Sequence, residues 1–167
     1  MSAAADITKI IEQEQALVFG EFTEDTGFSI AARIRARGLA GGWPVACDVR
    51  LWDRPIAYVA LAGSSADNAA WALRKSNTVR RLLRSSYRAT LETNAPDRMF
   101  PPQRDLPVSE FALSGGGFPI RVEGAGIIGS VTVSGLHERD DHEVVVAAIA
   151  AEIGRDPAPL ALPPLKR

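Results

Sequence analysis

Basic side chains concentrate in one stretch of the chain, and their charge is the strongest chemical signal in the sequence. Six of them lie between Asn68 and Leu91 with no acidic residue among them: Arg74, Lys75, Arg80, Arg81, Arg84 and Arg88. Several are three or four positions apart, so they can share one face of a helix. Such a face attracts carboxylates or phosphates, which arginine binds through two parallel hydrogen bonds. The residues with the spacing of such a face are Arg74, Arg81, Arg84 and Arg88.

Three other interpretations of the basic stretch stay open. The face could be solvated, it could form salt bridges to acids elsewhere, including those of a second subunit, or it could bind nucleic acid. The formal net charge of the chain is −1. This argues against nucleic acid as a partner, because proteins that coat nucleic acid are usually basic overall.

Histidine occurs only at positions 137 and 142, and neither has a neighbour spaced as a metal ligand. His142 lies within the run Asp140–Glu143, at the expected start of a helix. Carboxylates there complement the positive end of the helix dipole, so capping explains the acids without a metal. His142 either makes a local hydrogen bond or acts as a ligand or acid–base group, since the positive end of a helix favours the neutral imidazole.

A glycine-rich loop, Ser114–Gly117, precedes an apolar segment. Its backbone N–H groups could contact an anion, so Gly115 and Gly116 are candidates for close approach to a ligand. No lysine follows as it does in a P-loop, and glycine-rich loops are also common before edge strands. The sequence contains no evident nucleophile–base pair or metal-ligand set, and whether the protein is an enzyme stays open.

The elements that position these residues follow from the spacing of apolar side chains. Alternation predicts two hairpins, with strands over 45–52 and 56–62 and over 118–122 and 127–134. Helical spacing predicts helices over 7–18, 23–39, 66–83, 87–91 and 141–153. Strands that arrive as hairpins, without a helix between each pair, form antiparallel sheets. The predicted fold class is therefore α+β, with helices packed on an antiparallel sheet.

The last predicted helix is apolar almost all round over Val144–Ala151, and a helix of that kind must be buried. It lies either in the core or against another subunit, and we expect a homo-oligomer whose interface uses this helix or the sheet edge beside it. Residues 1–155 are expected to form the domain. The four prolines of residues 156–167 predict an extended tail, and the loop 93–107 is expected to be functional or mobile.

Length and composition fit a single globular domain. The chain has 167 residues, of which 46% are hydrophobic and 23% charged, as in folded domains with a core of their own. The single cysteine, Cys47, excludes an intramolecular disulfide and a cysteine-rich zinc module. No apolar run is long enough to cross a bilayer, and the first residues lack the basic and apolar regions of a secretory signal. We therefore expect a cytoplasmic protein with no membrane partner.

Several segments together resemble the UPF0303 family, within the wider group of heme-degrading, GlcG/HbpS-like domains. They are Pro44–Arg50, Asp67–Trp71, Arg74–Val79 with Ser85–Tyr87, Gly115–Ile120, Gly124–Leu136 and Asp141–Glu143. The resemblance covers residues 5–155. It implies a profilin-like, three-layer α/β/α domain with a five-stranded antiparallel sheet, and assembly into homo-oligomers. The wider group implies binding or degradation of heme, without agreed catalytic residues.

This resemblance gives the candidate residues a specific interpretation. Arg74 and Lys75 would pair with the propionates of heme, or with another flat anionic ligand, and His142 would be the axial ligand of the iron. Gly115 and Gly116 would let the backbone approach the ligand closely. A rival hypothesis is a non-enzymatic, homo-oligomeric scaffold that docks a protein partner. A third is an enzyme acting on a small organic acid.

Overall fold

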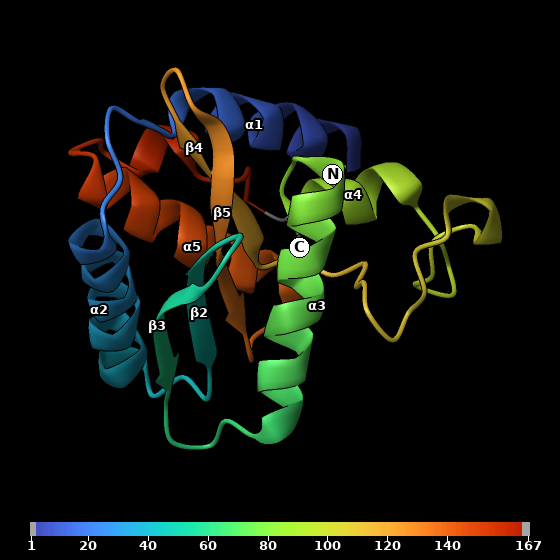
Figure 1. The fold of residues 1–167 in the computed structure, drawn as a ribbon, viewed down its shortest axis with the longest axis horizontal. Coiled ribbons are helices and arrows are strands. Elements are labelled where there is room, and N and C mark those ends of the chain that lie inside the picture. Colours follow the sequence, from blue (N-terminus) through green and yellow to red (C-terminus); the bar gives the residue numbers. More distant parts are fainter. Residues whose placement is uncertain (1–2, 165–167) are drawn as a thin grey trace.

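Five strands form one sheet at the centre of the molecule in the computed structural model, which describes residues 3–164 (Figure 1). The strands are β1 (Val18–Phe19), β2 (Ala46–Leu51), β3 (Pro55–Ala60), β4 (Gly117–Val122) and β5 (Gly126–Ser134). The helices are α1 (Ala3–Ala16), α2 (Glu24–Gly41), α3 (Ala66–Leu82), α4 (Ser86–Thr93) and α5 (Glu138–Glu152). The two predicted hairpins are present as β2–β3 and β4–β5, and the α+β fold class is confirmed.

The sheet is mixed, and the prediction of a purely antiparallel sheet was wrong. Its strand order is β1-β4-β5-β2-β3, and neighbouring strands are antiparallel except β1 and β4, which are parallel. Leu17 and Val18 continue the apolar spacing of the preceding helix, although that helix ends at Ala16. A strand of two residues is too short to show an alternation of its own, so the sequence pattern assigned it to the helix.

The two faces of the sheet differ in chemistry, because successive side chains of a strand point to opposite faces. Val131 and Val133 of β5 belong to the main apolar core, which also includes residues of α2 and α5. The intervening residues of β5 are polar, and Ser130 shares a hydrogen bond of 2.7 Å with Ser76 of α3. A polar layer therefore lies between α3 and the sheet, and the candidate site is at one end of this layer.

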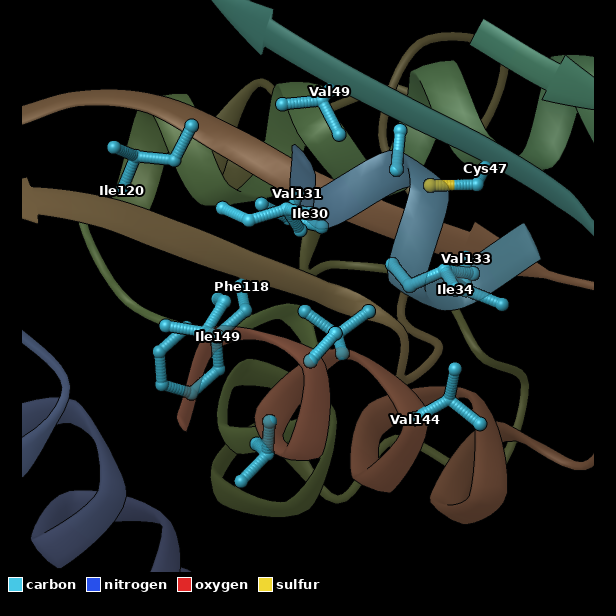
Figure 2. Packing of buried hydrophobic residues seen from close by; sticks show 14 of the residues in the cluster. Ile30, Ile34, Cys47, Val49, Phe118, Ile120, Val131, Val133, Val144 and Ile149 are labelled. Carbon is cyan, nitrogen blue, oxygen red and sulfur yellow. The ribbon is translucent and has the colours of Figure 1, made fainter. Parts of the chain in front are cut away.

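The apolar core lies between the other face of the sheet and helices α2 and α5 (Figure 2). Its members come from alternate strand positions and from one side of each helix: Ile30, Ile34, Cys47, Val49, Phe118, Ile120, Val131, Val133, Val145 and Ile149. Cys47 is 1% exposed, and burial raises the pKa of its thiol. The lone cysteine is therefore a core residue, as its alternating apolar neighbours indicate.

Helix α5 is covered within its own chain. Its apolar side chains pack with α2, β4 and β5, and Leu160 of the C-terminal segment packs against the same cluster. That segment contains a turn of 3-10 helix, Ala158–Leu160, and Leu162 is 5% exposed. The backbone N–H of Leu162 donates to Glu143 at 3.0 Å. The apolar character of α5 therefore needs no second subunit to explain it.

The C-terminal segment differs from the extended tail predicted for residues 156–167, because residues 158–164 dock on the domain and 165–167 lie outside the described residues. The loop that contains residues 93–107 also has a packed interior: Phe100, Leu106 and Leu113 form a small cluster with Ala89 of α4. Among residues 3–164, no helix is long and apolar enough to cross a membrane.

Candidate functional site

A buried ion pair connects the middle of α3 to the first turn of α5. Lys75 Nζ lies 2.9 Å from Asp141 Oδ2, and the two side chains are 3% and 2% exposed. Lys75 Nζ also donates to the carbonyl oxygen of Val133 at 3.1 Å. Asp141 accepts from the backbone N–H groups of Leu136 and Gly135, at 3.0 and 3.4 Å. The pair thus joins α3, the end of β5 and the start of α5.

Burial brings the proton affinities of these two groups towards each other. Loss of solvation lowers the pKa of Lys75, although attraction to Asp141 opposes the shift. Loss of solvation raises the pKa of Asp141. Attraction to Lys75 and the hydrogen bonds that Asp141 accepts oppose this shift. Groups perturbed in this way, where they border a cavity, are typical of functional sites.

A polar cavity of about 250 Å³ lies directly over the ion pair. Its lining combines the ion pair with side chains and backbone of α3, the glycine-rich loop and the end of β5: Asp67, Asn68, Trp71, Lys75, Ser114, Ser134, Gly135, Leu136 and Asp141. Asn68 also caps α3, because its side-chain oxygen accepts from the backbone N–H of Ser65 at 2.8 Å. The cavity offers hydrogen-bonding groups, one aromatic ring and an amine, which suits a small polar ligand. We refer to it as the Lys75 pocket.

Arg74 contacts Trp71, a residue of the pocket lining, and has an unused hydrogen-bond donor. Its guanidinium carbon is 4.4 Å from the centre of the Trp71 ring, so the two side chains form a cation–π contact. Within the described part of the chain, the buried Nε–H of Arg74 has no hydrogen-bond acceptor. Buried donors are nearly always paired, so this Nε–H is an exception, and its guanidinium is linked to the pocket through Trp71.

Gly115 and Gly116 are required by packing within the chain. Gly116 has a φ of +126°, and a Cβ at this position would lie 2.3 Å from the Val133 carbonyl oxygen and 2.9 Å from Lys75 Nζ. A Cβ on Gly115 would lie 2.2 Å from the carbonyl oxygen of Glu138. The glycines therefore let the loop 114–117 close over the ion pair. We predicted that Gly115 and Gly116 let the backbone approach a ligand. In the structure they let the loop backbone approach β5 and α5.

The basic stretch does not form one continuous ligand-binding face. Arg88 pairs with Glu14 and Glu92 at 2.8 Å each, and Arg84 pairs with Glu92 at 2.6 Å. Arg80 instead lies over the ring of Trp52, with 5.8 Å between its guanidinium carbon and the ring centre. Salt bridges to acids elsewhere in the same chain therefore account for the C-terminal part of the stretch. Arg74 is left as the arginine of this stretch that contacts the lining of the Lys75 pocket.

His142 is fully buried, with 0% of its surface exposed, and it does not line the Lys75 pocket. Its ring lies between Tyr87 and Phe118, with ring centres at 5.4 and 5.8 Å. His142 Nε2 is 2.7 Å from Gln13 Oε1. Burial, with a smaller contribution from the nearby positive charge of Arg139, lowers the pKa of His142 to about 3. The imidazole is therefore neutral at physiological pH.

The hydrogen bonds of Gln13 determine which nitrogen of His142 carries the proton. Gln13 Nε2 donates to the Leu160 carbonyl oxygen at 2.7 Å and to Glu143 at 3.2 Å. Gln13 Oε1 must then accept, so Nε2 of His142 carries its proton. Nδ1 has no partner within the described residues and is enclosed in the core. The prediction of His142 as an axial heme ligand does not fit this placement, because neither nitrogen is open to a ligand.

The residues present thus fit the carboxylates of heme better than its iron. Arg74 can bind a carboxylate, but Lys75 is already paired with Asp141. Of residues 3–164, no His, Cys or Met lines the Lys75 pocket or the larger cavity of about 510 Å³ between α2, α5 and the C-terminal segment. Among residues 3–164, no group of three metal-binding side chains is present.

Sequence reasoning missed the partner of Lys75. Asp141 was explained as a helix-capping acid, and the 66 positions that separate it from Lys75 carry no signal of their contact. Trp71 contributes an aromatic ring to the pocket lining and is partly exposed, so it can stack on a flat ligand.

A family model and individual relatives match most of the chain. A model of the HbpS-like family, described as haem degrading protein HbpS-like, matches residues 22–150. A UPF0303 protein of Brucella canis is 52% identical over 157 residues, which cover 94% of this chain and 93% of that protein. A UPF0303 protein of Mesorhizobium japonicum is 51% identical over 162 residues, covering 97% of each chain.

Solved structures share the fold at lower sequence identity. The crystal structure of Ybr137w protein has a TM-score of 0.78 and 24% identity, covering 87% of this chain and 86% of that one. The crystal structure of HbpS has a TM-score of 0.64 and 18% identity, covering 81% and 92%. A PduOC:heme complex has a TM-score of 0.66 and 15% identity, covering 78% and 94%. With the sequence match over most of its length and this shared fold, the chain belongs to the HbpS-like family and, within it, to the UPF0303 proteins.

Proposed function

We propose that this protein binds a ligand through a carboxylate at the Lys75 pocket, the ligand being either heme, held by its propionates, or a free small organic acid. The observation that carries the proposal is the Nε–H of Arg74, which has no acceptor among residues 3–164 and belongs to a guanidinium stacked on Trp71 of the pocket lining. A carboxylate can accept from two N–H groups of one guanidinium at once. The cation–π contact with Trp71 holds the guanidinium in place before the ligand arrives.

The charges around the pocket are compatible with an anion. Asp141 is compensated by Lys75 within 2.9 Å. Asp67 lines the pocket but is exposed, so solvent and salt screen its charge. Arg74 has no acidic partner among the ion pairs of residues 3–164. The Trp71 ring adds an apolar surface on which a flat ligand can stack.

Heme is the ligand that the family description suggests, and the fold is shared with a protein whose structure is described as a heme complex. Bound heme would supply iron redox chemistry. In this chain Arg74 would hold a propionate and Trp71 would contact the macrocycle edge, while His142 would stay in the core. A pocket of about 250 Å³ takes a propionate or a small acid completely, so most of a porphyrin would lie outside it.

Titration of the purified protein tests the proposal, with hemin followed by absorbance and with small mono- and dicarboxylic acids followed by calorimetry. Arg74→Ala should weaken binding by roughly 10- to 150-fold, because a hydrogen bond to a charged group contributes about 1.5–3 kcal/mol. Arg81→Ala, an exposed arginine on the same helix, is the matched control and should bind like the wild type. Arg74→Ala with unchanged affinity for every ligand that binds would exclude the proposal.

The two ligand sources give different results in this experiment. Saturation by hemin at one per chain, without binding of small acids, identifies heme as the source of the carboxylate. Binding of small acids, with hemin uptake that does not saturate and is insensitive to Arg74→Ala, identifies a free organic acid.

A non-enzymatic homo-oligomer is the second candidate function, and the free edge of the sheet favours it. β3 is one of the two outer strands of the sheet and carries no charged residue over Pro55–Ala60, and Tyr58 is 50% exposed. An uncharged outer strand is suited to pairing with the same strand of a second copy. Light scattering at micromolar concentration tests this assembly: a dimer or larger species that Tyr58→Lys dissociates supports it, and a monomeric wild type contradicts it.

A further inference from the structure

Lys75 differs from an ordinary surface lysine in three respects. Its ammonium group is almost completely buried, it borders a cavity, and a carboxylate lies within hydrogen-bond distance of it. Two of its three N–H donors are accounted for, by Asp141 and by the Val133 carbonyl oxygen. The third N–H has no acceptor within residues 3–164, and Lys75 is part of the pocket lining.

An amine attacks a carbonyl carbon only in its neutral form, and the surroundings of Lys75 provide for that form. Loss of solvation lowers the pKa of Lys75 and raises that of Asp141, so transfer of one proton from the ammonium to the carboxylate costs less than it does in water. The transfer converts a buried ion pair into a neutral amine and a neutral acid. Lysines that form imines with carbonyl substrates are activated by desolvation in a similar way.

We propose that Lys75 Nζ forms an imine with the carbonyl carbon of a small oxo acid that enters the Lys75 pocket. This inference rests on the proposed function for one point, the recognition of the acid's carboxylate by Arg74. The amine of Lys75 is independent of that recognition and would also react with an uncharged aldehyde of similar size.

Formation of the imine needs proton transfers that Lys75 and Asp141 can carry out. Asp141 takes a proton from the Lys75 ammonium, and the amine nitrogen then bonds to the carbonyl carbon while the C=O π pair moves to the oxygen. The added nitrogen loses a proton and the oxygen gains one, which gives a carbinolamine. Asp141 returns its proton to the hydroxyl group, the C–O bond breaks, water leaves and the protonated C=N bond forms. No electrons are gained or lost, so no oxidant or reductant is needed.

The pocket limits the size of the carbonyl compound. Its volume of about 250 Å³ corresponds to roughly eight water-sized groups at about 30 Å³ each. An oxo acid of three to five carbons fits, and the side chains of Asn68 and Ser114 are available to hydrogen-bond its oxygens. A Cβ at position 116 would lie 2.9 Å from Lys75 Nζ, so glycine at this position leaves room for the nitrogen.

Reductive trapping tests the inference on the unmodified protein. The chain contains three lysines, Lys9, Lys75 and Lys166, so a peptide map assigns every adduct. The protein is incubated near neutral pH with pyruvate and sodium cyanoborohydride, and in a parallel sample with acetaldehyde. We expect the reduced adduct on Lys75 to exceed that on the part-exposed Lys9 by at least 10-fold in the pyruvate sample. Labelling of Lys75 no faster than Lys9 with both reagents would overturn the inference.

Two variants separate this inference from the proposed function. Lys75→Arg keeps the positive charge, and in a protein shown to be folded by circular dichroism it should lose the adduct at position 75 and keep the one at Lys9. Arg74→Ala should reduce the pyruvate adduct at Lys75 but leave the acetaldehyde adduct unchanged. Equal labelling of Lys75 in wild type and Arg74→Ala with both reagents would support the imine and contradict carboxylate recognition by Arg74.

Discussion

His142 is a residue type that often binds a metal or transfers a proton, but in this protein it is a buried core residue. Its only hydrogen-bond partner within residues 3–164 is Gln13, which also binds Glu143 and the C-terminal segment. The neutral imidazole thus belongs to a polar chain that anchors residues 160–162 to α1 and α5. The sequence placed His142 correctly in α5. It could not show that Gln13, 129 positions away, would enclose it.

The burial of His142 makes the stability of the protein depend on pH. Its pKa is about 3 in the folded protein and about 6.5 in an unfolded chain. The folded state therefore binds fewer protons, so the contribution of His142 is fully present above about pH 6.5 and is lost as the pH falls towards 3. The loss should approach roughly 1.4 kcal/mol per pH unit in that window. Comparison of urea unfolding of wild type and His142→Leu between pH 7 and pH 4.5 measures it.

The expected result is a difference in unfolding free energy between wild type and His142→Leu that shrinks as the pH falls, because only the wild type takes up this proton on unfolding. Parallel pH profiles would show that His142 is protonated or accessible in the folded state. A shift of the hemin Soret band in His142→Leu would restore its role as an iron ligand.

At the scale of elements, Gly129 of β5 packs closely against the backbone of the neighbouring strand. A Cβ on Gly129 would lie 2.1 Å from the carbonyl oxygen of Arg50 on the neighbouring strand. The obstacle is backbone, so it cannot move aside as a side chain could. Gly129→Val should lower the unfolding free energy by about 1–3 kcal/mol or more. Gly20→Val, where nothing lies within 4 Å, is the control in chemical denaturation, and equal midpoints for the two variants would contradict the packing.

Leu162 anchors the C-terminal segment to the domain. Leu162 is 5% exposed and packs with Ile10 and Tyr87. Leu162→Ala should lower the unfolding free energy by about 2–4 kcal/mol, the usual cost of a truncated core leucine. Leu39→Ala, at a leucine that is 55% exposed, should change it far less. A Leu162→Ala protein as stable as Leu39→Ala would indicate that the segment is free in solution, as the proline-rich composition predicts.

The pattern of the sequence predicted the elements with long, regular spacing. The hairpins β2–β3 and β4–β5 and the helices α2, α3 and α5 are present close to their expected positions. The strand β1 was missed because Val18 and Phe19 pair with β4 only in the folded molecule. The docking of residues 158–164 was missed because it depends on Gln13, Arg139 and Glu143, which are distant in sequence.

At the scale of the whole molecule, the fold places Lys75 and the loop 114–117 together and His142 elsewhere. Lys75 and this loop meet at one end of the polar layer between α3 and the sheet, where Arg74 contacts Trp71 of the pocket lining. His142 follows Asp141 directly in sequence but points into the core on the other side of the backbone. The sequence singled out the basic residues and the glycines, and their role as a ligand site stays a prediction. It could not show that acids of α1 and α4 pair with Arg84 and Arg88.

The proposed hydrogen bond from Arg74 to a ligand carboxylate at the Lys75 pocket can be observed in the NMR signal of the Arg74 Nε–H. The side-chain N–H resonance of Arg74, assigned by its loss in Arg74→Ala, is followed during titration with a small organic acid and, separately, with iron-free protoporphyrin. We expect this resonance to move strongly downfield, as it does when a charged hydrogen bond forms, and to saturate with the binding curve. A ligand that binds while the Arg74 resonance stays in place would exclude the hydrogen bond.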